Sequence, residues 1–440
     1  MMKLINSRTT TGIAALSIAT LALTACGPDT SGEEEAVGEG TDWAEVEPAE
    51  EILFWSSHPG ESVEEEEAMI EAFEEETGIT VTLENAGANY EETSQQFQTS
   101  QGTGTTPDVV VLSDATWFTN YLNDSLLSVD EVLEAAEVDT DGYVEALYGD
   151  YVYEDAHYGV PYARSTPLFY YNADHYEEAG IDAPPETWEE VGEISAQLME
   201  AETADSAFSF PPQEEYPAWW MQNLIWGYGG SWSDEWDFSP VASEETVEAL
   251  QFAQDATDDW ASVSSGDPAD DFGSGATSQI VQSTGSLGGI LETADFEVGV
   301  AFLPGGPEAE GETPTGGAGL MISADSEPEE QLAAAMFIGF VTNAENTATF
   351  SQATGYMPVQ QDVDMSAVYE ETPQFEVAVE QLERARSQDN ARVFVPGGDL
   401  ELSQTLQEIL TSDVDVAEEM TAVQESLEEL YERDLASELE

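Results

Sequence analysis

Basic residues are almost absent from this chain, whose 440 residues hold seven Lys and Arg against 93 Asp and Glu. Two of the seven, Lys3 and Arg8, lie close to the N-terminus, and no other Lys follows. The remaining cations are Arg164, Arg384, Arg386, Arg392 and Arg433. A nucleic-acid partner is not expected, because no basic stripe exists to neutralise phosphates. Any anionic small molecule must be met by one of these few arginines.

Cysteine, histidine and long apolar runs are also scarce. Cys26 is the single cysteine, so no internal disulfide can form. His58, His157 and His175 are isolated, and no zinc-type spacing occurs, so no metal site is expected. No Gly-x-Ser-x-Gly elbow or phosphate-binding loop ending in Gly-Lys-Ser/Thr is present. With 93 acids, a pair of carboxylates carries no catalytic information. The sequence therefore gives no support for an enzyme or a cofactor.

The acid excess gives a net charge of −86 at pH 7, far more than solubility requires. The screening length is about 8 Å at physiological salt and about 3 Å at molar salt, so repulsion between these carboxylates largely vanishes only in strong salt. A disordered acidic chain is the alternative. Aromatic residues make up 10% of the chain, including ten Trp, which indicates a folded protein. We therefore expect a protein from a halophile.

Residues 1–25 read as a secretory signal with a positive start and an apolar stretch from about Gly12 to Leu23. That stretch is too short to span a bilayer as a mature helix. Its end, Leu23-Thr24-Ala25-Cys26, resembles a bacterial lipobox, in which the cysteine is acylated. Residues 26–50 are mostly Gly, Glu, Ser, Thr and Pro and are expected to form a tether. The predicted location is the outer face of the cell membrane, through a lipid on Cys26.

The remaining 390 or so residues are enough for two domains and begin with a parallel α/β pattern. Strands are predicted near 51–56, 79–84 and 106–113, separated by a helix over 62–77 and a polar helix around Phe97. Four consecutive apolar residues in the third strand indicate burial on both faces.

A second unit is predicted to begin near Arg164. The capping box at Thr187 starts a helix, and 205–240 are predicted to be loop-rich. Later segments read as strands over 294–303 and 316–322, a helix over 328–342 and helices from about Pro373. Arg384 and Arg386 are expected on one of these helices, paired with Glu.

Four segments favour capture of a ligand over chemistry. Each combines hydroxyls, glycines or a rigid turn: Ser165-Thr166-Pro167, Thr284 to Gly289, Gly316 to Gly319, and Ala353 to Pro358. Glycines let a ligand approach the backbone closely, and amides at a helix start favour an anion. Arg392 lies between apolar residues in Asp389-Asn-Ala-Arg-Val-Phe-Val-Pro-Gly, unlike an arginine on a charged helix face.

In this order the segments resemble the extracellular solute-binding proteins of ABC importers (family 1), over about residues 50–431. The most specific matches are to the branch that binds sn-glycerol 3-phosphate or glycerophosphodiesters, and they are Arg164-Ser-Thr-Pro-Leu-Phe-Tyr-Tyr-Asn, Ser283-Thr-Gly-Ser-Leu-Gly-Gly, Gly316-Gly-Ala-Gly-Leu and Thr354-Gly-Tyr-Met-Pro. The resemblance implies a two-lobe α/β fold of type II, with a ligand cleft between lobes joined by hinge strands. The implied N-terminal lobe is 51–163 with 317–345, and the implied C-terminal lobe is 164–316 with 346–440.

The resemblance also implies eight ligand-binding positions, which are Tyr90, Asp114, Ser165, Trp219, Ser286, Gly317, Tyr356 and Arg392. Arg392 would hold a phosphate with Ser165, Ser286 and the Gly317 amide, while Tyr90 and Asp114 would take glycerol hydroxyls. Membrane permease subunits would receive the solute.

Two departures from the family pattern widen the choice of ligand. The family carries Glu at the position of Asp114 and a second basic residue after the position of Arg392, where this chain has Val-Phe-Val-Pro-Gly. A phosphodiester with a quaternary ammonium, such as glycerophosphocholine, therefore competes with a phosphomonoester. An oligosaccharide stacked on Trp219, Trp220, Trp226, Trp232 and Trp236 is the alternative within the same fold, and a glycan-acting enzyme is the alternative from another class.

The acid excess predicts a fold that depends on salt. Screening of surface repulsion should raise the Tm steeply between low salt and molar KCl or NaCl. Circular dichroism melts across that range measure the effect. A Tm that does not change with salt would contradict the halophile interpretation.

The lipobox predicts acylation of Cys26 and cleavage before it. Cys26→Ser should release the protein from membranes or leave the signal uncut, because the only thiol is lost. Membrane fractionation with gel migration tests this, and a variant that behaves like the wild type would show that the lipoprotein interpretation is wrong.

Overall fold

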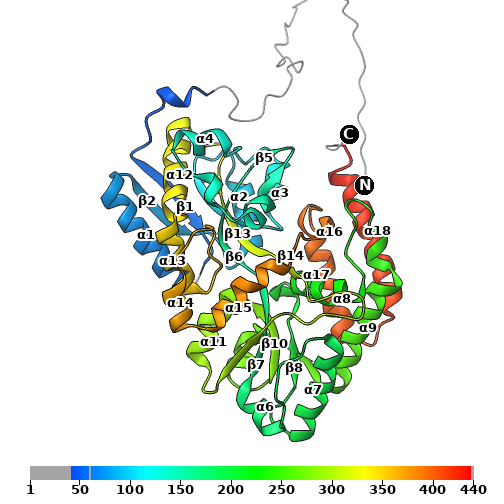
Figure 1. Cartoon of the computed structure of the whole chain (residues 1–440). Coiled ribbons are helices and arrows are strands. Elements are labelled where there is room, and N and C mark those ends of the chain that lie inside the picture. The colour runs from blue at the N-terminus through cyan, green and yellow to red at the C-terminus, as the bar shows by residue number, and fades with distance from the viewer. Residues whose placement is uncertain (1–40, 59–60, 438–440) are drawn as a thin grey trace, which may run out of the picture. The chain divides into compact units, whose positions relative to one another are not determined.

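A computed structural model describes residues 41–58 and 61–437. The predicted signal segment and Cys26 lie outside the described residues. The described residues belong to a single unit that contains two five-stranded sheets, here called the first and second sheet, each with its own helices. Figure 1 shows the first sheet with α1, α12 and α13 in its upper half, and the second sheet with α6, α7 and α11 in its lower half. These two layered bodies are called the first and second lobe.

The first sheet has the strand order β2-β1-β3-β13-β6. Its strands are β1 (Glu51–Ser56), β2 (Thr80–Asn85), β3 (Val109–Ser113), β6 (Val160–Ser165) and β13 (Gly316–Ile322). β1 runs parallel to β2 and β3, whereas β13 runs antiparallel to β3 and β6. All five residues of β3 are buried, as the unbroken apolar run predicts. The predicted parallel α/β start of the chain is confirmed.

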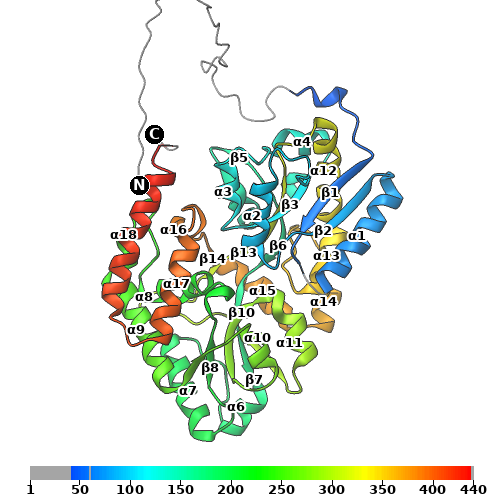
Figure 2. The ribbon, with the colours of Figure 1, turned by 180° about the vertical axis from the view of Figure 1, so that it is seen from behind.

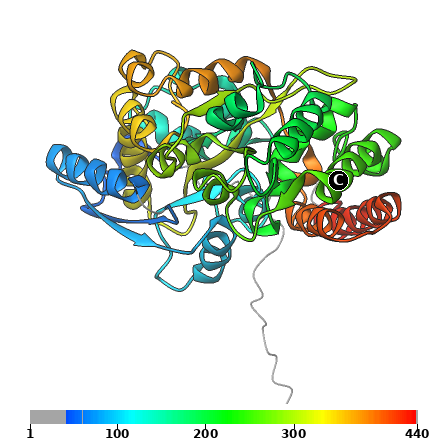
Figure 3. The ribbon, with the colours of Figure 1, turned by 90° about the horizontal axis from the view of Figure 1, so that it is seen from below.

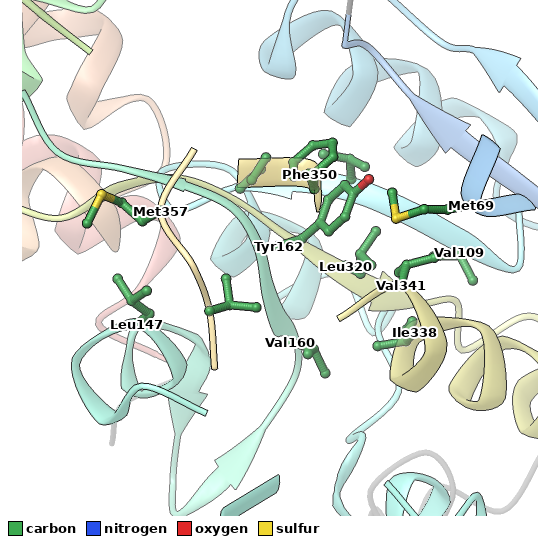
Figure 4. Close-up of a cluster of buried hydrophobic side chains, with 14 of the residues drawn as sticks. Met69, Val109, Leu147, Val160, Tyr162, Leu320, Ile338, Val341, Phe350 and Met357 are labelled. Carbon is green, nitrogen blue, oxygen red and sulfur yellow. The ribbon is translucent and has the colours of Figure 1, made fainter. Parts of the chain in front are cut away.

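Helices cover both faces of the first sheet and enclose an apolar core on each face. They are α1 (Glu61–Thr77), α2 (Tyr90–Ser100), α3 (Trp117–Tyr121), α4 (Asp130–Ala135), α5 (Glu145–Tyr148), α12 (Pro328–Val341) and α13 (Ala344–Thr354). Figure 4 shows Val109 and Leu320 of the sheet near Ile338 and Val341 of α12. Tyr162 on β6 stacks on Phe350 of α13 with ring centroids 4.7 Å apart. Burial of these apolar side chains fixes the edge of the sheet where the strands end.

The second sheet has the order β11-β7-β10-β8-β9. Its strands are β7 (Pro167–Asn172), β8 (Phe208–Phe210), β9 (Ala261–Val263), β10 (Gln279–Ser283) and β11 (Val298–Ala301). β7 is antiparallel to β10 and β11, while β8 is parallel to β9 and β10. Two short ladders complete the strands: β4 (Val152–Tyr153) with β5 (Ala156–His157), and β12 (Thr313–Pro314) with β14 (Ala385–Arg386).

The helices of the second lobe include one that the sequence analysis missed. They are α6 (Ala173–Ala179), α7 (Trp188–Ala201), α8 (Pro217–Tyr228), α9 (Glu244–Asp259), α10 (Pro268–Gly273) and α11 (Leu287–Thr293). Residues 205–240 were predicted to be loop-rich, and this is wrong, because they contain β8 and α8. Eleven consecutive residues of α8, Pro217 to Gly227, are buried. A helix buried all round shows no polar face and therefore no amphipathic period.

The C-terminal helices are α14 (Ser366–Glu371), α15 (Gln374–Gln381), α16 (Asn390–Val393), α17 (Gly398–Thr411) and α18 (Val416–Asp434). α17 packs on α8, α9 and α18, and Figure 2 shows α17 beside α18. Seen from below in Figure 3, the red α18 lies beside the green helices of the second lobe. No helix of the described residues has the length and apolarity needed to cross a membrane.

Three stretches of chain connect the lobes. β6 passes directly into β7 through Thr166, residues 302–315 return from β11 to β13, and residues 355–365 leave α13 for α14. The first two lie next to each other, because Gly316 and Gly317 of β13 pair with Ser165 and Arg164 of β6. The predicted two-lobe α/β fold with connecting strands is confirmed.

The predicted domain boundaries stay predictions, and the structure adds a detail at two of them. The tether was predicted to extend to residue 50, but Trp43, Val46 and Ala49 pack against the core of the first lobe, and the Ala49 N–H donates to the Glu329 carbonyl at 2.8 Å. The packed chain therefore begins before residue 50, because these apolar side chains can bury themselves. The lobe boundary at residues 345–346 stays a prediction, since α13 contacts α1 of the first lobe and α11 of the second.

The bulge at Gly317 yields a prediction about stability. Gly317 has φ +90°, and a Cβ there would lie 2.1 Å from the Ala163 carbonyl oxygen. Gly317→Ala should therefore lower the free energy of unfolding by at least the ~1–3 kcal/mol typical of backbone strain. Gly104→Ala is the control, because Gly104 has φ +76° but open space around its Cβ position. Urea unfolding at molar salt should show the larger loss for Gly317→Ala, and equal losses would contradict the proposed clash.

Candidate functional site

A cavity of about 400 Å³ lies between the lobes, within the size range of small-molecule sites. The first lobe contributes Ser57, His58, Tyr90 and Asp114, and the second contributes Trp219, Ser286 and Arg392 among others. Ser165 and Gly317 join them from the ends of β6 and β13 where the lobes meet, and the connection after α13 adds Tyr356. All eight residues that the sequence predicts as ligand-binding therefore line one cavity. Their contact with a ligand stays a prediction.

Strand ends of the first sheet place several of these residues. Asp114 follows the last residue of β3, and its N–H donates to the Gly317 carbonyl at 3.1 Å. Ser165 ends β6 beside Gly316 of β13. Tyr90 is the first residue of α2, whose preceding Asn89 caps the helix by accepting the Glu92 N–H at 2.9 Å. In open α/β sheets, ligands bind at such strand ends.

The two remaining segments, Thr284 to Gly289 and Ala353 to Pro358, meet at the cavity wall. Thr284–Ser286 form a short 3-10 helix that leads into α11, and the Thr284 N–H donates to the Thr166 carbonyl at 3.0 Å. A Cβ at Gly285 would lie 2.9 Å from a ring carbon of Tyr356. Glycine at position 285 therefore allows Tyr356 to pack on this turn, beside Ser286.

Arg392, on α16, is the only arginine among the described residues that lines the cavity. Its Nη1 donates to Asp114 Oδ2 at 3.2 Å and to Gln388 Oε1, and its Nε lies 2.7 Å from Asp399 Oδ1. Burial lowers the pKa of Arg392, but the carboxylates of Asp114 and Asp399 outweigh burial and raise it above its ordinary value. The guanidinium therefore stays charged and is already flanked by two carboxylates. Since Asp114 belongs to the first lobe, this pair also joins the lobes.

The other arginines of the described chain have partners elsewhere. Arg164 is fully buried, donates to the Tyr151 hydroxyl at 2.6 Å and pairs with Asp150. Arg384 ends a 3-10 helix and stacks over Phe302, with its guanidinium carbon 4.3 Å from the ring centroid.

The predicted helix is wrong for Arg386, whereas Arg384 ends a short 3-10 helix. Arg386 lies on β14 and pairs with Glu312 at 3.0 Å while covering Trp226. The chain is extended at Arg386 because β14 pairs with β12. The carboxylate that pairs with Arg386 therefore comes from a distant segment and not from the next turn of a helix.

Of the five tryptophans considered for an aromatic wall, Trp219 alone lines the cavity. Its Nε1 donates to the Thr315 carbonyl at 3.0 Å, which fixes the indole against Gly316. Trp220, Trp226 and Trp232 are buried in the core of the second lobe, and Trp236 packs against Phe394 and Tyr431. The expectation that this cluster stacks on sugar rings is therefore not supported by its position.

One side of the cavity is acidic. Glu214, Glu215 and Asp267 line it together with Tyr216 and Trp219. Burial, with a further contribution from Asp267 and Glu214, raises the pKa of Glu215 to about 7. A positively charged group placed here would favour the ionised carboxylate and would gain attraction from all three acids.

Sequence reasoning missed His58, which was treated as isolated. Its ring is buried at the cavity wall, with Nδ1 2.8 Å from Glu66 Oε1 and Nε2 3.1 Å from the Tyr90 hydroxyl. The usable signal was its place two residues after the first predicted strand, where cavity residues gather. Glu66 gave no such signal, because it lies in a run of glutamates on the predicted helix.

Contacts between the lobes also border the cavity. The Tyr216 hydroxyl of the second lobe donates to Glu91 Oε2 of α2 at 3.2 Å. Phe394, two residues after Arg392, meets the ring of Phe118 on α3 edge to face at 5.0 Å. Together with the Arg392–Asp114 pair, these contacts hold the lobes around the cavity.

Comparison with known proteins places this architecture among transport proteins. Residues 68–377 match the family described as bacterial extracellular solute-binding proteins. The sn-glycerol-3-phosphate-binding periplasmic protein UgpB of Pectobacterium atrosepticum is 26% identical over 360 residues, which cover 77% of this chain and 81% of the relative. UgpB of Escherichia coli K12 is also 26% identical, over 355 residues that cover 75% of this chain and 80% of the relative.

Solved structures agree with the family match. The crystal structure of UgpB from Mycobacterium tuberculosis in complex with glycerophosphocholine is 39% identical, has a TM-score of 0.84 and covers 88% of this chain and 99% of that chain. Maltose-bound MalE3 of T. maritima is 21% identical with a TM-score of 0.77, covers 87% of this chain and 100% of that chain, and shows the fold alone. The chain therefore belongs to the bacterial extracellular solute-binding proteins.

Proposed function

We propose that this protein is the substrate-binding subunit of an ABC importer and that it captures a glycerophosphodiester in the cavity between the lobes. The observation that carries the proposal is a buried guanidinium, Arg392, lining the same cavity as Ser165, Ser286 and Gly317. Charge-assisted hydrogen bonds from Arg392 would hold the phosphate, with hydroxyl and amide groups completing its surroundings. The UgpB relatives, which are named for sn-glycerol-3-phosphate or crystallised with glycerophosphocholine, support the same chemistry.

The charges of the cavity favour a zwitterion over a dianion. Arg392 is flanked by Asp114 and Asp399, and the remaining wall adds Glu215 and Asp267. A phosphomonoester would bring close to two negative charges into these surroundings, whereas a phosphodiester brings one. A quaternary ammonium on the diester could lie against Trp219 and the acidic side. Glycerophosphocholine therefore fits better than sn-glycerol 3-phosphate.

The oligosaccharide alternative has less support. Carboxylates and aromatic rings both suit sugars, and maltose-binding structures share the fold. However, three of the five tryptophans lie in the core, and Trp219 alone faces the cavity. A sugar would also leave the buried charge of Arg392 without a ligand partner, in a chain that has very few cations to place.

The proposed action is binding and release without chemical turnover. Ligand contacts with both lobes would stabilise the closed arrangement, because a ligand shifts a conformational equilibrium by its differential affinity for the two states. The closed complex would dock on membrane permease subunits. The lipid on Cys26 would keep the protein at the outer face of the membrane, in a salt-rich environment.

Isothermal titration at molar salt tests this function and the role of Arg392 together. The wild type should bind glycerophosphocholine more tightly than sn-glycerol 3-phosphate and should not bind maltose. Arg392→Ala should weaken glycerophosphocholine binding by roughly 30- to several-thousand-fold, since truncating one partner of a buried charge pair costs about 2–5 kcal/mol.

Arg384→Ala is the matched control, because Arg384 stacks on Phe302 away from the cavity lining. Arg392→Lys provides a second test that keeps the positive charge near Asp114 and Asp399 while losing the planar fork. Circular dichroism confirms folding of each variant. Tight maltose binding, or equal glycerophosphocholine affinity in the wild type and Arg392→Ala, would contradict the proposal.

A further inference from the structure

A chain of buried polar groups runs from α1 to the cavity wall. It begins at Glu66, which is 1% exposed, and reaches Tyr90 through the ring of His58. Glu66 Oε1 also accepts the Ser56 hydroxyl at 2.9 Å, and Ser56 Oγ accepts the His58 N–H at 3.2 Å. The imidazole is therefore fixed on one side by groups that the rest of the site does not use.

The carboxylate sets the direction of these hydrogen bonds. Glu66 Oε1 can only accept, so the proton between it and His58 belongs to Nδ1, 2.8 Å away. In a neutral imidazole the other nitrogen is then an acceptor. With the ring in this neutral tautomer, the Tyr90 hydroxyl, 3.1 Å from Nε2, donates its proton to the ring. The oxygen of Tyr90 is left with lone pairs for its remaining partners.

Tyr356 packs on the cavity side of the same imidazole, with the two ring centroids 5.7 Å apart. Burial raises the pKa of both Tyr90 and Tyr356, so both hydroxyls keep their protons. The Tyr90 hydroxyl therefore keeps the proton that it donates to His58.

Every other group that packs against His58 is compatible with this direction. The ring faces Glu66 from α1, Tyr90 from α2, Tyr162 from β6 and Tyr356 from the segment after α13. The Tyr162 hydroxyl lies 3.5 Å from Glu66 Oε1 and donates to it, while its ring stacks on Phe350. No described group around His58 offers a competing acceptor for Nδ1.

We propose that Glu66 and His58 are positioning residues that make the Tyr90 hydroxyl at the cavity wall a hydrogen-bond acceptor, which selects the hydroxyl-bearing end of the ligand and turns its anionic oxygens away. This inference rests on the proposed function, because it assigns the glycerol hydroxyls to this wall and the phosphate to the Arg392 side. An anionic oxygen at this wall would be repelled by the lone pairs of the tyrosine oxygen. A glycerol hydroxyl would instead donate a hydrogen bond to that oxygen.

Nitrogen-15 NMR of histidine reads the hydrogen-bond direction without any ligand. The chain has three histidines, so a His58→Asn spectrum assigns the signals of His58. The wild type should show a neutral His58 protonated at Nδ1, and Glu66→Gln should keep that tautomer because an acceptor oxygen remains. Glu66→Leu removes the acceptor and should shift His58 toward protonation at Nε2. Protonation at Nε2 in the wild type would overturn the inference.

Titration with two phosphocholine esters tests the selection. Glu66→Leu should weaken binding of glycerophosphocholine by roughly three- to tenfold, the effect of one hydrogen bond, and should leave propyl phosphocholine, which lacks the glycerol hydroxyls, unchanged. Glu66→Gln should restore the wild-type affinity. His157→Gln is the control, because His157 pairs with Asp130 away from the cavity lining.

The remaining outcomes separate this inference from the proposed function. Equal losses for both esters in Glu66→Leu would show a purely structural role and overturn the selection. A loss in Glu66→Gln as large as in Glu66→Leu would show that charge, not hydrogen-bond direction, matters. A wild type that binds neither ester would overturn the proposed function, and the NMR tautomer would then decide the direction of the chain by itself.

Discussion

The ion pair between Arg392 and Asp114 is the interaction on which the rest of the site depends. It joins a residue of the second lobe to the end of β3 in the first, and both side chains are almost fully buried. Breaking such a pair leaves an uncompensated buried charge, so the guanidinium stabilises the carboxylates of Asp114 and Asp399 as much as they stabilise it. The position of the lobes and the charge of the cavity are therefore set by the same group.

The distribution of arginines follows from this constraint. Arg164 and Arg392 are buried, and each compensates carboxylates that connect different parts of the fold. Thr315, on the return connection to β13, donates to the same Asp150 oxygen that Arg164 contacts. In a chain with 93 acids, these two buried cations lie where burial would otherwise make a carboxylate too costly.

Two kinds of polar surroundings meet in the cavity. Near Arg392 a positive charge is balanced by Asp114 and Asp399, so the net attraction for an anion is modest. Near His58 the hydrogen bonds that begin at Glu66 end on the Tyr90 hydroxyl. A ligand with a singly charged phosphate, free hydroxyls and a cationic group matches these surroundings better than one defined by charge alone.

The sequence by itself determined the elements with strong local signals. The alternating and continuous apolar runs predicted β1, β2 and β3, and the glycine-rich segments and Arg392 predicted the cavity lining through the family resemblance. These features can be predicted because they depend on residues close together in the sequence. The positive φ of Gly317 and the helix cap at Thr187 are examples. Tertiary structure decided the rest. The buried helix α8 has no amphipathic period, and Arg386 found Glu312 across a ladder between distant strands. The contact between Glu66 and Ser56 also depends on tertiary packing, because α1 places this one glutamate of a long acidic run against the end of β1. No local pattern distinguishes Glu66 from the other glutamates of the run.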